Sequence, residues 1–190
     1  LGWLCWNGKY WEIDKTGAIV RRAKQTVTSI YAEAQQTDNE EMRKALAKHA
    51  MRSESQAAID HMIELAKTEI EVVATAENYD TDPFLLNCFN GTINLRNGKF
   101  ESHNKFSMIT KMATVTYDAT ATCPLFEKFL MRIMDGNVSL IHFIKRIIGY
   151  SLTGDISEQC LFILYGTGAN GKTTLLTVIQ NLLSDYAMQC

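Results

Sequence analysis

The residues of this chain best suited to chemistry form a glycine-rich loop that ends in a lysine and a threonine. The stretch Gly166-Thr167-Gly168-Ala169-Asn170-Gly171-Lys172-Thr173 fits the pattern G-x-x-x-x-G-K-[ST] at every fixed position. Glycines allow backbone N–H groups to approach a polyphosphate closely. Lys172 would reach the β- and γ-phosphates as a point charge, and the Thr173 hydroxyl would bind Mg²⁺. The spacing therefore predicts a phosphate-binding loop.

This prediction assigns ATP and Mg²⁺ as ligands. Lys172 and Thr173 are the predicted catalytic residues, and Thr173 is the predicted magnesium ligand. The predicted nucleotide-binding residues are Gly166, Thr167, Gly168, Ala169, Asn170, Gly171, Lys172, Thr173 and Thr174. The alternative interpretation is a glycine-rich turn in front of a core helix.

The segments on either side of the loop fit the same chemistry. Residues 160–165 are a continuous apolar run, which predicts a strand buried on both faces. Residues 174–183 have leucine and isoleucine at helical spacing. A helix that begins after the loop would direct its N–H groups and its partial positive charge at a phosphate.

Other parts of a P-loop ATPase cannot be found after the loop. Such an enzyme needs a second acidic motif, and often an arginine from a neighbouring subunit, but Asp185 is the only acid after Thr173. The sequence also begins at Leu1 rather than Met, so we expect it to be a piece of a longer protein. We expect this piece, by itself, to hydrolyse ATP weakly or not at all. One strand and one helix cannot bury the apolar run. We expect that run to pack on neighbouring helices, join another chain or become disordered.

Composition is that of a globular chain with a core. Of 190 residues, 46% are hydrophobic and 21% are charged, and the net charge is −2. This balance argues against a strongly basic nucleic-acid binder, although it allows a local basic patch. No apolar run approaches the roughly 18 residues of a membrane helix. The five cysteines are far apart, which predicts buried, reduced thiols in a cytosolic protein and no zinc site. The four histidines are isolated, and we assign them no role.

The region before the loop predicts a mixture of hairpins and helices. Asn7-Gly8 would join two aromatic-rich strands over 3–6 and 9–13. Their aromatic residues suit either a core or a base-stacking platform; they are Trp3, Trp6, Tyr10 and Trp11. Helical periodicity covers 20–49 with an interruption at 35–39. A further helix would follow a capping box at Ser53-Glu54-Ser55-Gln56 and extend to Ile70.

A second set of elements follows residue 80. The sequence predicts a turn over 80–83, a hairpin of 92–95 and 99–101 around Asn97-Gly98, and a half-buried strand over 112–117. Two helices follow, one after Cys123-Pro124 and one capped by Asn137 that ends near Gly149. We therefore predict three parts: an α+β accessory domain over 1–121, a helical connector over 122–156, and the start of a P-loop ATPase domain over 157–190.

The order of these motifs and predicted elements resembles that of the phage and plasmid primase–helicase family, which is related to the poxvirus-type primase–helicases. The resemblance extends over nearly the whole chain. It rests on these segments: Trp6-Asn7-Gly8-Lys9-Tyr10-Trp11, Asp82-Pro83, Asn90-Gly91-Thr92-Ile93-Asn94-Leu95, Thr110-Lys111, Ala121, Cys123-Pro124, Phe126, Phe129, Gly149-Tyr150-Ser151-Leu152-Thr153-Gly154, Glu158-Gln159, the loop ending at Thr173, and Asp185-Tyr186.

The resemblance implies a superfamily 3 helicase whose ATPase domains form a ring, usually a hexamer, around DNA and move along a single strand. It implies an accessory domain, a helical collar and the first strand, loop and helix of an α/β, AAA+-like ATPase core. It also implies a cytoplasmic setting in the bacterial host of a phage, prophage or plasmid. Only the loop residues correspond to catalytic parts of the family, and no primase site is evident.

Two other interpretations are open. The chain could be a non-enzymatic module for DNA docking or subunit assembly, in which the loop is only a turn. It could also belong to a different P-loop ATPase, such as a clamp loader or a signalling ATPase, although the accessory elements argue against this.

Overall fold

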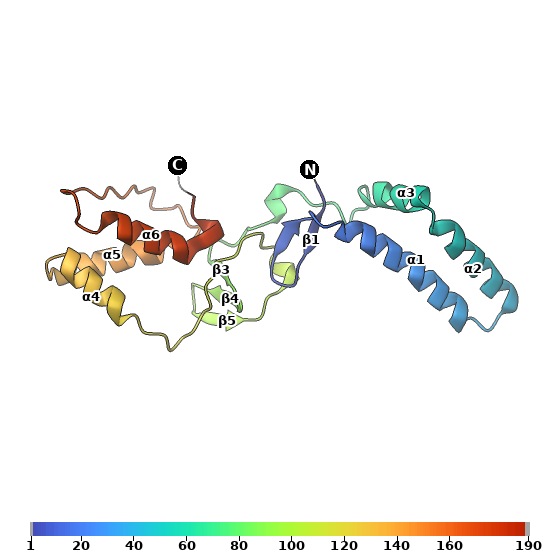
Figure 1. Cartoon of the computed structure of the whole chain (residues 1–190), viewed down its shortest axis with the longest axis horizontal. Helices are drawn as coiled ribbons and strands as arrows, with labels where there is room; N and C mark the ends of the chain where they lie inside the picture. The colour runs from blue at the N-terminus through green and yellow to red at the C-terminus, as the bar shows by residue number, and fades with distance from the viewer. Residues whose placement is uncertain (1, 189–190) are drawn as a thin grey trace. The chain divides into compact units, whose positions relative to one another are not determined.

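The computed structural model describes residues 2–188, and its contacts divide the chain into two compact units. The first unit contains the chain up to Asn7 together with Glu12–Asn78, and the second contains Gly8–Trp11 and the chain from Tyr79 onward. Figure 1 shows the elements of each unit in order. The candidate site lies entirely in the second unit.

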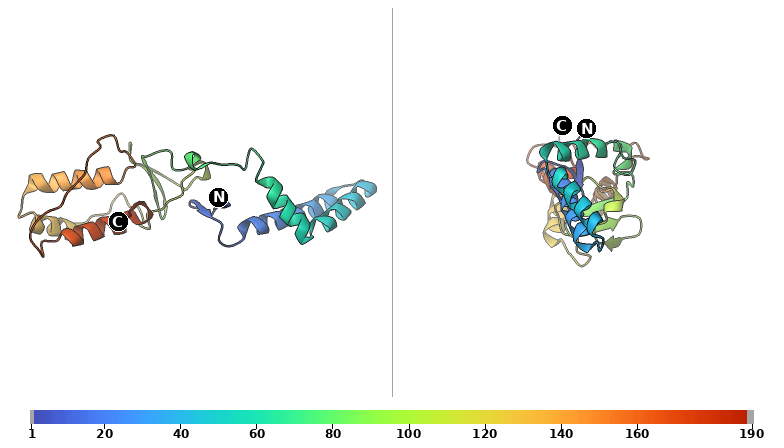
Figure 2. Two further views of the ribbon diagram at one scale, coloured as in Figure 1. Left: turned by 90° about the horizontal axis from the view of Figure 1, so that it is seen from above. Right: turned by 90° about the vertical axis from the view of Figure 1, so that its right-hand side faces the viewer.

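Three helices form most of the first unit: α1 (Ala18–Gln36), α2 (Glu40–Ser53) and α3 (Gln56–Ala66). Helices α1 and α2 lie side by side as a helical hairpin (Figures 1 and 2). The buried residues Ala23, Val27 and Ala50 are small, which allows close packing. The predicted interruption is confirmed, because the break falls at Thr37–Asn39 and the Asn39 side chain accepts a hydrogen bond from the Met42 amide.

Helix α1 begins with help from a residue outside it. Gly17 precedes the helix and has no side chain to cap it, but the Asp14 carboxylate accepts hydrogen bonds from the amides of Ala18 and Ile19, each at 2.9 Å. These backbone hydrogen bonds lower the pKa of Asp14 to about 2, since they favour its charged form.

The start and the end of α3 differ from the prediction. Ser53 is still part of α2 and donates its hydroxyl to the His49 carbonyl, so the predicted capping box is wrong. Ser55 caps α3 instead, by accepting a hydrogen bond from the Ala58 amide at 3.3 Å. The helix ends at Ala66 and does not extend to Ile70 as expected, and Ile70 is 89% exposed.

Both predicted hairpins form. Strands β1 (Leu4–Trp6) and β2 (Trp11–Ile13) make a two-stranded sheet, with Gly8 in its connection at φ 101°. Strand β4 (Gly91–Asn94) pairs antiparallel with β5 (Lys99–Glu101) around Gly98, which has a φ of 72°. The sequence did not predict β3 (Leu85–Cys88), which pairs with β4 in the register Leu86 to Ile93.

The predicted strand over 112–117 is not formed, although its alternating burial is confirmed. Ala113 is fully buried and Thr114 is exposed. Only scattered bonds join this segment to β3, including the Ala113 amide to the Asn87 carbonyl at 2.8 Å. The amides of Met112 and Thr114 donate to side chains of the chain after α6, so a regular ladder cannot form.

Three helices of the second unit pack around one apolar cluster: α4 (Pro124–Ile133), α5 (Val138–Ser151) and α6 (Lys172–Leu183). Their buried residues are Leu130, Ile141, Ile144 and Leu175. Figures 1 and 2 show these helices side by side. The predicted cap of α5 is confirmed by a 3.0 Å hydrogen bond from the Leu140 amide to the Asn137 side chain. Leu140 and Phe143 of α5 are exposed, although both are apolar.

The apolar run before the loop is not a strand. Residues 160–165 have irregular backbone, and most of their large side chains are exposed, including Leu161 at 83% and Tyr165 at 91%. The expectation that this run packs on neighbouring helices is confirmed for one residue. The Phe162 ring packs edge-on against Phe143 of α5, at 6.5 Å between ring centroids. A strand needs a neighbour to accept and donate its backbone hydrogen bonds, and the described residues place none beside this segment.

Short helical turns and the cysteines complete the described chain. The turns are η1 (Ala76–Asn78), η2 (Lys105–Ser107) and η3 (Ser184–Tyr186).

The prediction of buried thiols is confirmed for Cys88, and burial raises the pKa of its thiol. The prediction is wrong for Cys123 and Cys160, which are exposed. Cys190 lies outside the described residues.

Candidate functional site

The predicted phosphate loop lies directly before α6, as the sequence predicts. Gly171 adopts the left-handed conformation with a φ of 85°, and α6 begins at Lys172. Leu175, one turn into the helix, is buried in the cluster formed with α4 and α5. The apolar face of α6 therefore fixes the position at which the loop ends.

Two of the loop glycines are required by geometry. A Cβ at Gly166 would lie 2.4 Å from the Asn170 amide nitrogen, and Gly166 has a φ of 149°. A Cβ at Gly171 would lie 2.7 Å from Cγ2 of Ile133 and 3.2 Å from Cε2 of Phe129, so the loop backbone rests directly on α4. A Cβ at Gly168 would meet nothing within 4 Å.

The Lys172 side chain turns back onto the loop. Its ammonium donates to the carbonyl of Gly166 at 3.0 Å, to the carbonyl of Thr167 at 3.1 Å and to Oδ1 of Asn170 at 2.7 Å. An ammonium has three N–H donors, and each has a partner here. Four of the predicted site residues are thereby brought together around one positive charge.

Thr173, the last residue of the motif, and the following Thr174 lie outside this arrangement. Thr173 and Thr174 are exposed in the first turn of α6. Among residues 2–188, no group of three or more histidine, cysteine, aspartate or glutamate side chains is placed to hold a metal ion. Thr173 is thus a single hydroxyl at a helix start, without acidic partners in the described chain.

These residues fit a phosphate group in chemistry and in position. The loop provides glycines in conformations that suit close backbone approach, an ammonium and the N-terminus of a helix. Lys172, however, must give up one or more of its contacts within the loop before it can donate to a bound oxygen.

A buried polar network around Asn87 links η3 to the sheet, and no sequence pattern predicted it. Asn87 on β3 is fully buried, and its amide nitrogen donates to the carbonyls of Lys9 and Lys111. Its Oδ1 accepts from Thr92 at 3.0 Å and lies 2.9 Å from Nδ1 of His103. The backbone amide of Asn87 donates to the Tyr186 hydroxyl at 3.2 Å.

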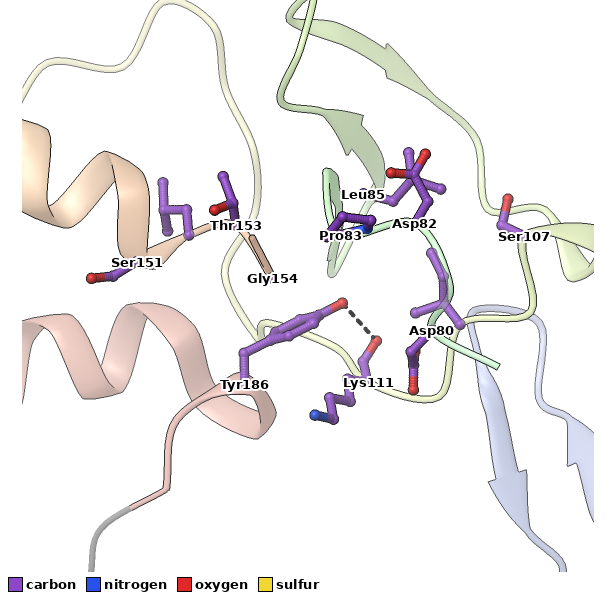
Figure 3. Close-up of a pocket in the computed structure, with 12 residues that line it drawn as sticks. Asp80, Asp82, Pro83, Leu85, Ser107, Lys111, Ser151, Thr153, Gly154 and Tyr186 are labelled. Atoms are coloured by element: carbon purple, nitrogen blue, oxygen red, sulfur yellow. Dashed lines mark hydrogen bonds between the residues drawn. The ribbon is translucent and has the colours of Figure 1, made fainter. Parts of the chain in front are cut away.

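Tyr186 of η3 also lines a pocket of about 210 Å³, together with Leu85 of β3 and Ser151 at the end of α5. Figure 3 shows its hydroxyl directed at the Lys111 carbonyl, with Thr153 and Gly154 nearby. Burial raises the pKa of Tyr186 to about 12, because it disfavours the charged phenolate. Only the Asp185-Tyr186 pair in the resemblance marked this residue in advance.

The aromatic residues near the start are half-buried. The Trp11 indole donates to the Lys105 carbonyl at 2.8 Å, and its ring packs edge-on against Tyr79 at 6.2 Å between centroids. The Lys9 ammonium lies 3.2 Å from the centroid of the Phe89 ring. These contacts favour a packing role for Trp11 over a base-stacking one.

The sequence matches the family described as D5 N terminal like over residues 1–135, which is more than half of the chain. The chain belongs to this D5 N-terminal-like family. The resemblance to the primase–helicases of phages and viruses is thereby confirmed. The family match ends before the phosphate loop, so it does not itself describe the loop residues.

One curated relative of this D5 N-terminal-like chain is the putative helicase L207/L206 of Acanthamoeba polyphaga mimivirus. The two are 28% identical over 112 residues, which is 57% of this chain and 12% of the relative. The chain therefore spans about an eighth of that relative's length. Of the helices within residues 2–188, none has the length and apolar character to cross a membrane.

Proposed function

We propose that this chain is part of an ATP-dependent DNA helicase of the phage or plasmid primase–helicase type, and that its loop binds ATP. The observation that supports this most strongly is the position of Lys172. It is the first residue of α6, it follows glycines that need their special backbone conformations, and it concentrates a positive charge in the loop.

The proposal gives each loop residue a role. Backbone N–H groups of 166–171 would surround the phosphates, and Lys172 would neutralise the charge that develops during phosphoryl transfer. Thr173 and Thr174 are exposed at the start of α6, where a hydroxyl is available to a magnesium ion bound with the nucleotide. The second acidic motif and the arginine of a neighbouring subunit would come from outside the described chain.

The proposed domain division follows from these roles. Residues 1–121 would form the accessory domain, 122–156 the collar in which α4 and α5 meet other subunits, and 157–190 the start of the ATPase domain. The proposed partners are single-stranded DNA, contacted mainly through the rest of the ATPase domain, and further copies of the chain in a ring. The name of the mimivirus relative, a putative helicase, supports this assignment.

The experiment that tests the proposal is calorimetric titration with ATP and Mg²⁺. It compares the 190-residue chain with Lys172→Ala, and also with a longer product of the same reading frame if one is expressed. Binding that is lost in Lys172→Ala supports the proposal. Binding in the longer product alone would mean that the loop needs further strands to form its site.

Absence of binding in every protein would contradict the proposal and favour the non-enzymatic alternative. In that case, loss of single-stranded DNA affinity on Trp6→Ala or Trp11→Ala would indicate DNA docking. Self-association through α4 and α5 without DNA binding would indicate subunit assembly.

A further inference from the structure

We infer that the Asn170 side chain acts as a latch, which means that it holds the Lys172 ammonium against the oxygens of the loop. In this closed position Lys172 cannot bind a phosphate, and a nucleotide must displace Asn170 to bind. The inference rests on the proposed function, because it concerns the regulation of the same site. It assigns Asn170 a positioning role that differs from that of a phosphate ligand.

The first argument is the number of donors on Lys172. Its ammonium has three N–H groups, and all three are used by oxygens of the loop itself. A phosphate oxygen can therefore form a hydrogen bond with Lys172 only if one of the present bonds is broken. The closed loop competes directly with the nucleotide for the charge that should bind it.

The second argument concerns which bond is the most important. The bond to Oδ1 of Asn170 is the shortest of the three, at 2.7 Å, and it is the only one to a side chain. Hydrogen bonds with a charged partner are stronger than neutral ones. Release of the Asn170 side chain needs a rotation about its own χ angles, whereas release of Gly166 or Thr167 needs movement of the backbone.

The third argument is that the surroundings fix Asn170 in this position. Its side-chain nitrogen, Nδ2, lies so close to Gly166 that a Cβ added to Gly166 would be 2.4 Å from it. On the other side, Gly171 rests on Phe129 and Ile133 of α4. Asn170 is therefore held between the start of the loop and a loop end that α4 supports, with Oδ1 directed at the ammonium.

The test compares Asn170→Ala, Asn170→Asp and the unchanged chain. A matched control is Asn181→Ala, which removes the same amide from an exposed position near the other end of α6. The first measurement needs no nucleotide: the rate at which an amine-reactive reagent acylates Lys172, followed by mass spectrometry with Lys128 and Lys48 as internal references. The second is the affinity for ATP with Mg²⁺ and for inorganic triphosphate.

We expect Asn170→Ala to speed acylation of Lys172 and to tighten nucleotide binding about tenfold, since a charge-assisted bond no longer competes with phosphate. Asn170→Asp should slow acylation and weaken binding, and Asn181→Ala should change neither. Circular dichroism shows whether each variant keeps its helices.

Unchanged acylation in Asn170→Ala would overturn the latch. Faster acylation with weaker binding would also overturn it and would make Asn170 a phosphate ligand, while the proposed function would stand. If neither the unchanged chain nor any variant binds nucleotide, in this chain or in a longer product, the proposed function fails and the latch fails with it.

Discussion

Two polar side chains, Lys172 and Asn87, each gather several hydrogen-bond partners in the second unit. The Lys172 ammonium is bound by three oxygens of its own loop. Asn87 is bound by the nearby Thr92 and also by groups from distant parts of the chain, including the carbonyls of Lys9 and Lys111. Asn87 is fully buried and has its hydrogen-bonding groups satisfied, which is the condition under which a buried amide does not destabilise a fold. Loss of a partner from this network leaves a buried group unpaired, and Tyr186 is such a partner.

Tyr186→Phe should lower the free energy of unfolding by about 1–3 kcal/mol at neutral pH, because the Asn87 amide loses its acceptor. The variant should also change the response to alkali. The pKa of Tyr186 is about 12 in the folded chain and 10 in its ordinary state. The folded chain therefore holds this proton more tightly, and the stabilisation is complete below pH 10 and is lost as the pH rises toward 12.

Urea unfolding at a series of pH values measures both effects. The loss of stability between pH 10 and 12 should be smaller in Tyr186→Phe. Tyr165→Phe is the matched control, because the Tyr165 side chain is 91% exposed. An equal slope in Tyr186→Phe and in the unchanged chain would contradict the prediction.

The contact between α4 and the loop shows how one element constrains another. The apolar faces of α4, α5 and α6 meet at Leu130 and Leu175, and this packing brings Gly171 against Phe129 and Ile133. A side chain at Gly171 would need both a left-handed backbone and space that α4 occupies.

Gly171→Ala should therefore destabilise the second unit by about 1–3 kcal/mol through backbone strain, with an additional cost where α4 must move. Gly168→Ala is the matched control, since a Cβ there meets nothing within 4 Å. Chemical denaturation, followed by circular dichroism, compares the two variants. Equal stability of Gly171→Ala and Gly168→Ala would show that α4 does not restrict the loop.

At the level of the whole molecule, the described residues contain the proposed nucleotide loop and none of the sheet that an ATPase core needs. Its strands form a two-stranded sheet and a three-stranded sheet, both before the loop, and residues 160–165 are irregular. No acidic cluster within residues 2–188 is placed to hold a metal ion. The parts that would activate water are thus not assembled around Thr173.

We therefore expect the 190-residue chain to release phosphate from ATP at or near the background rate, even if it binds the nucleotide. A phosphate-release assay with Lys172→Ala as the control measures this. Turnover that is well above background and is abolished by Lys172→Ala would show that the chain assembles a complete site, for example by pairing with further copies of itself.

The sequence alone determined the features that depend on neighbours along the chain. Helical periodicity located α1, α2 and α4–α6, turn residues located two hairpins, and the fixed positions of the loop motif located Lys172 at a helix start. Each of these follows from interactions across a few residues, so short patterns describe them well.

Only the tertiary structure decided the features that depend on distant partners. Residues 160–165 have a strand-like pattern, but the structure places no strand beside them within residues 2–188. The amides of Met112 and Thr114 donate to side chains after α6, and residues 112–117 form no regular ladder. Asn87 and Tyr186 are separated by 99 positions, so no local pattern could join them. The position of the Lys172 ammonium is likewise decided by the tertiary structure, because the three oxygens that it binds come together only when the loop folds.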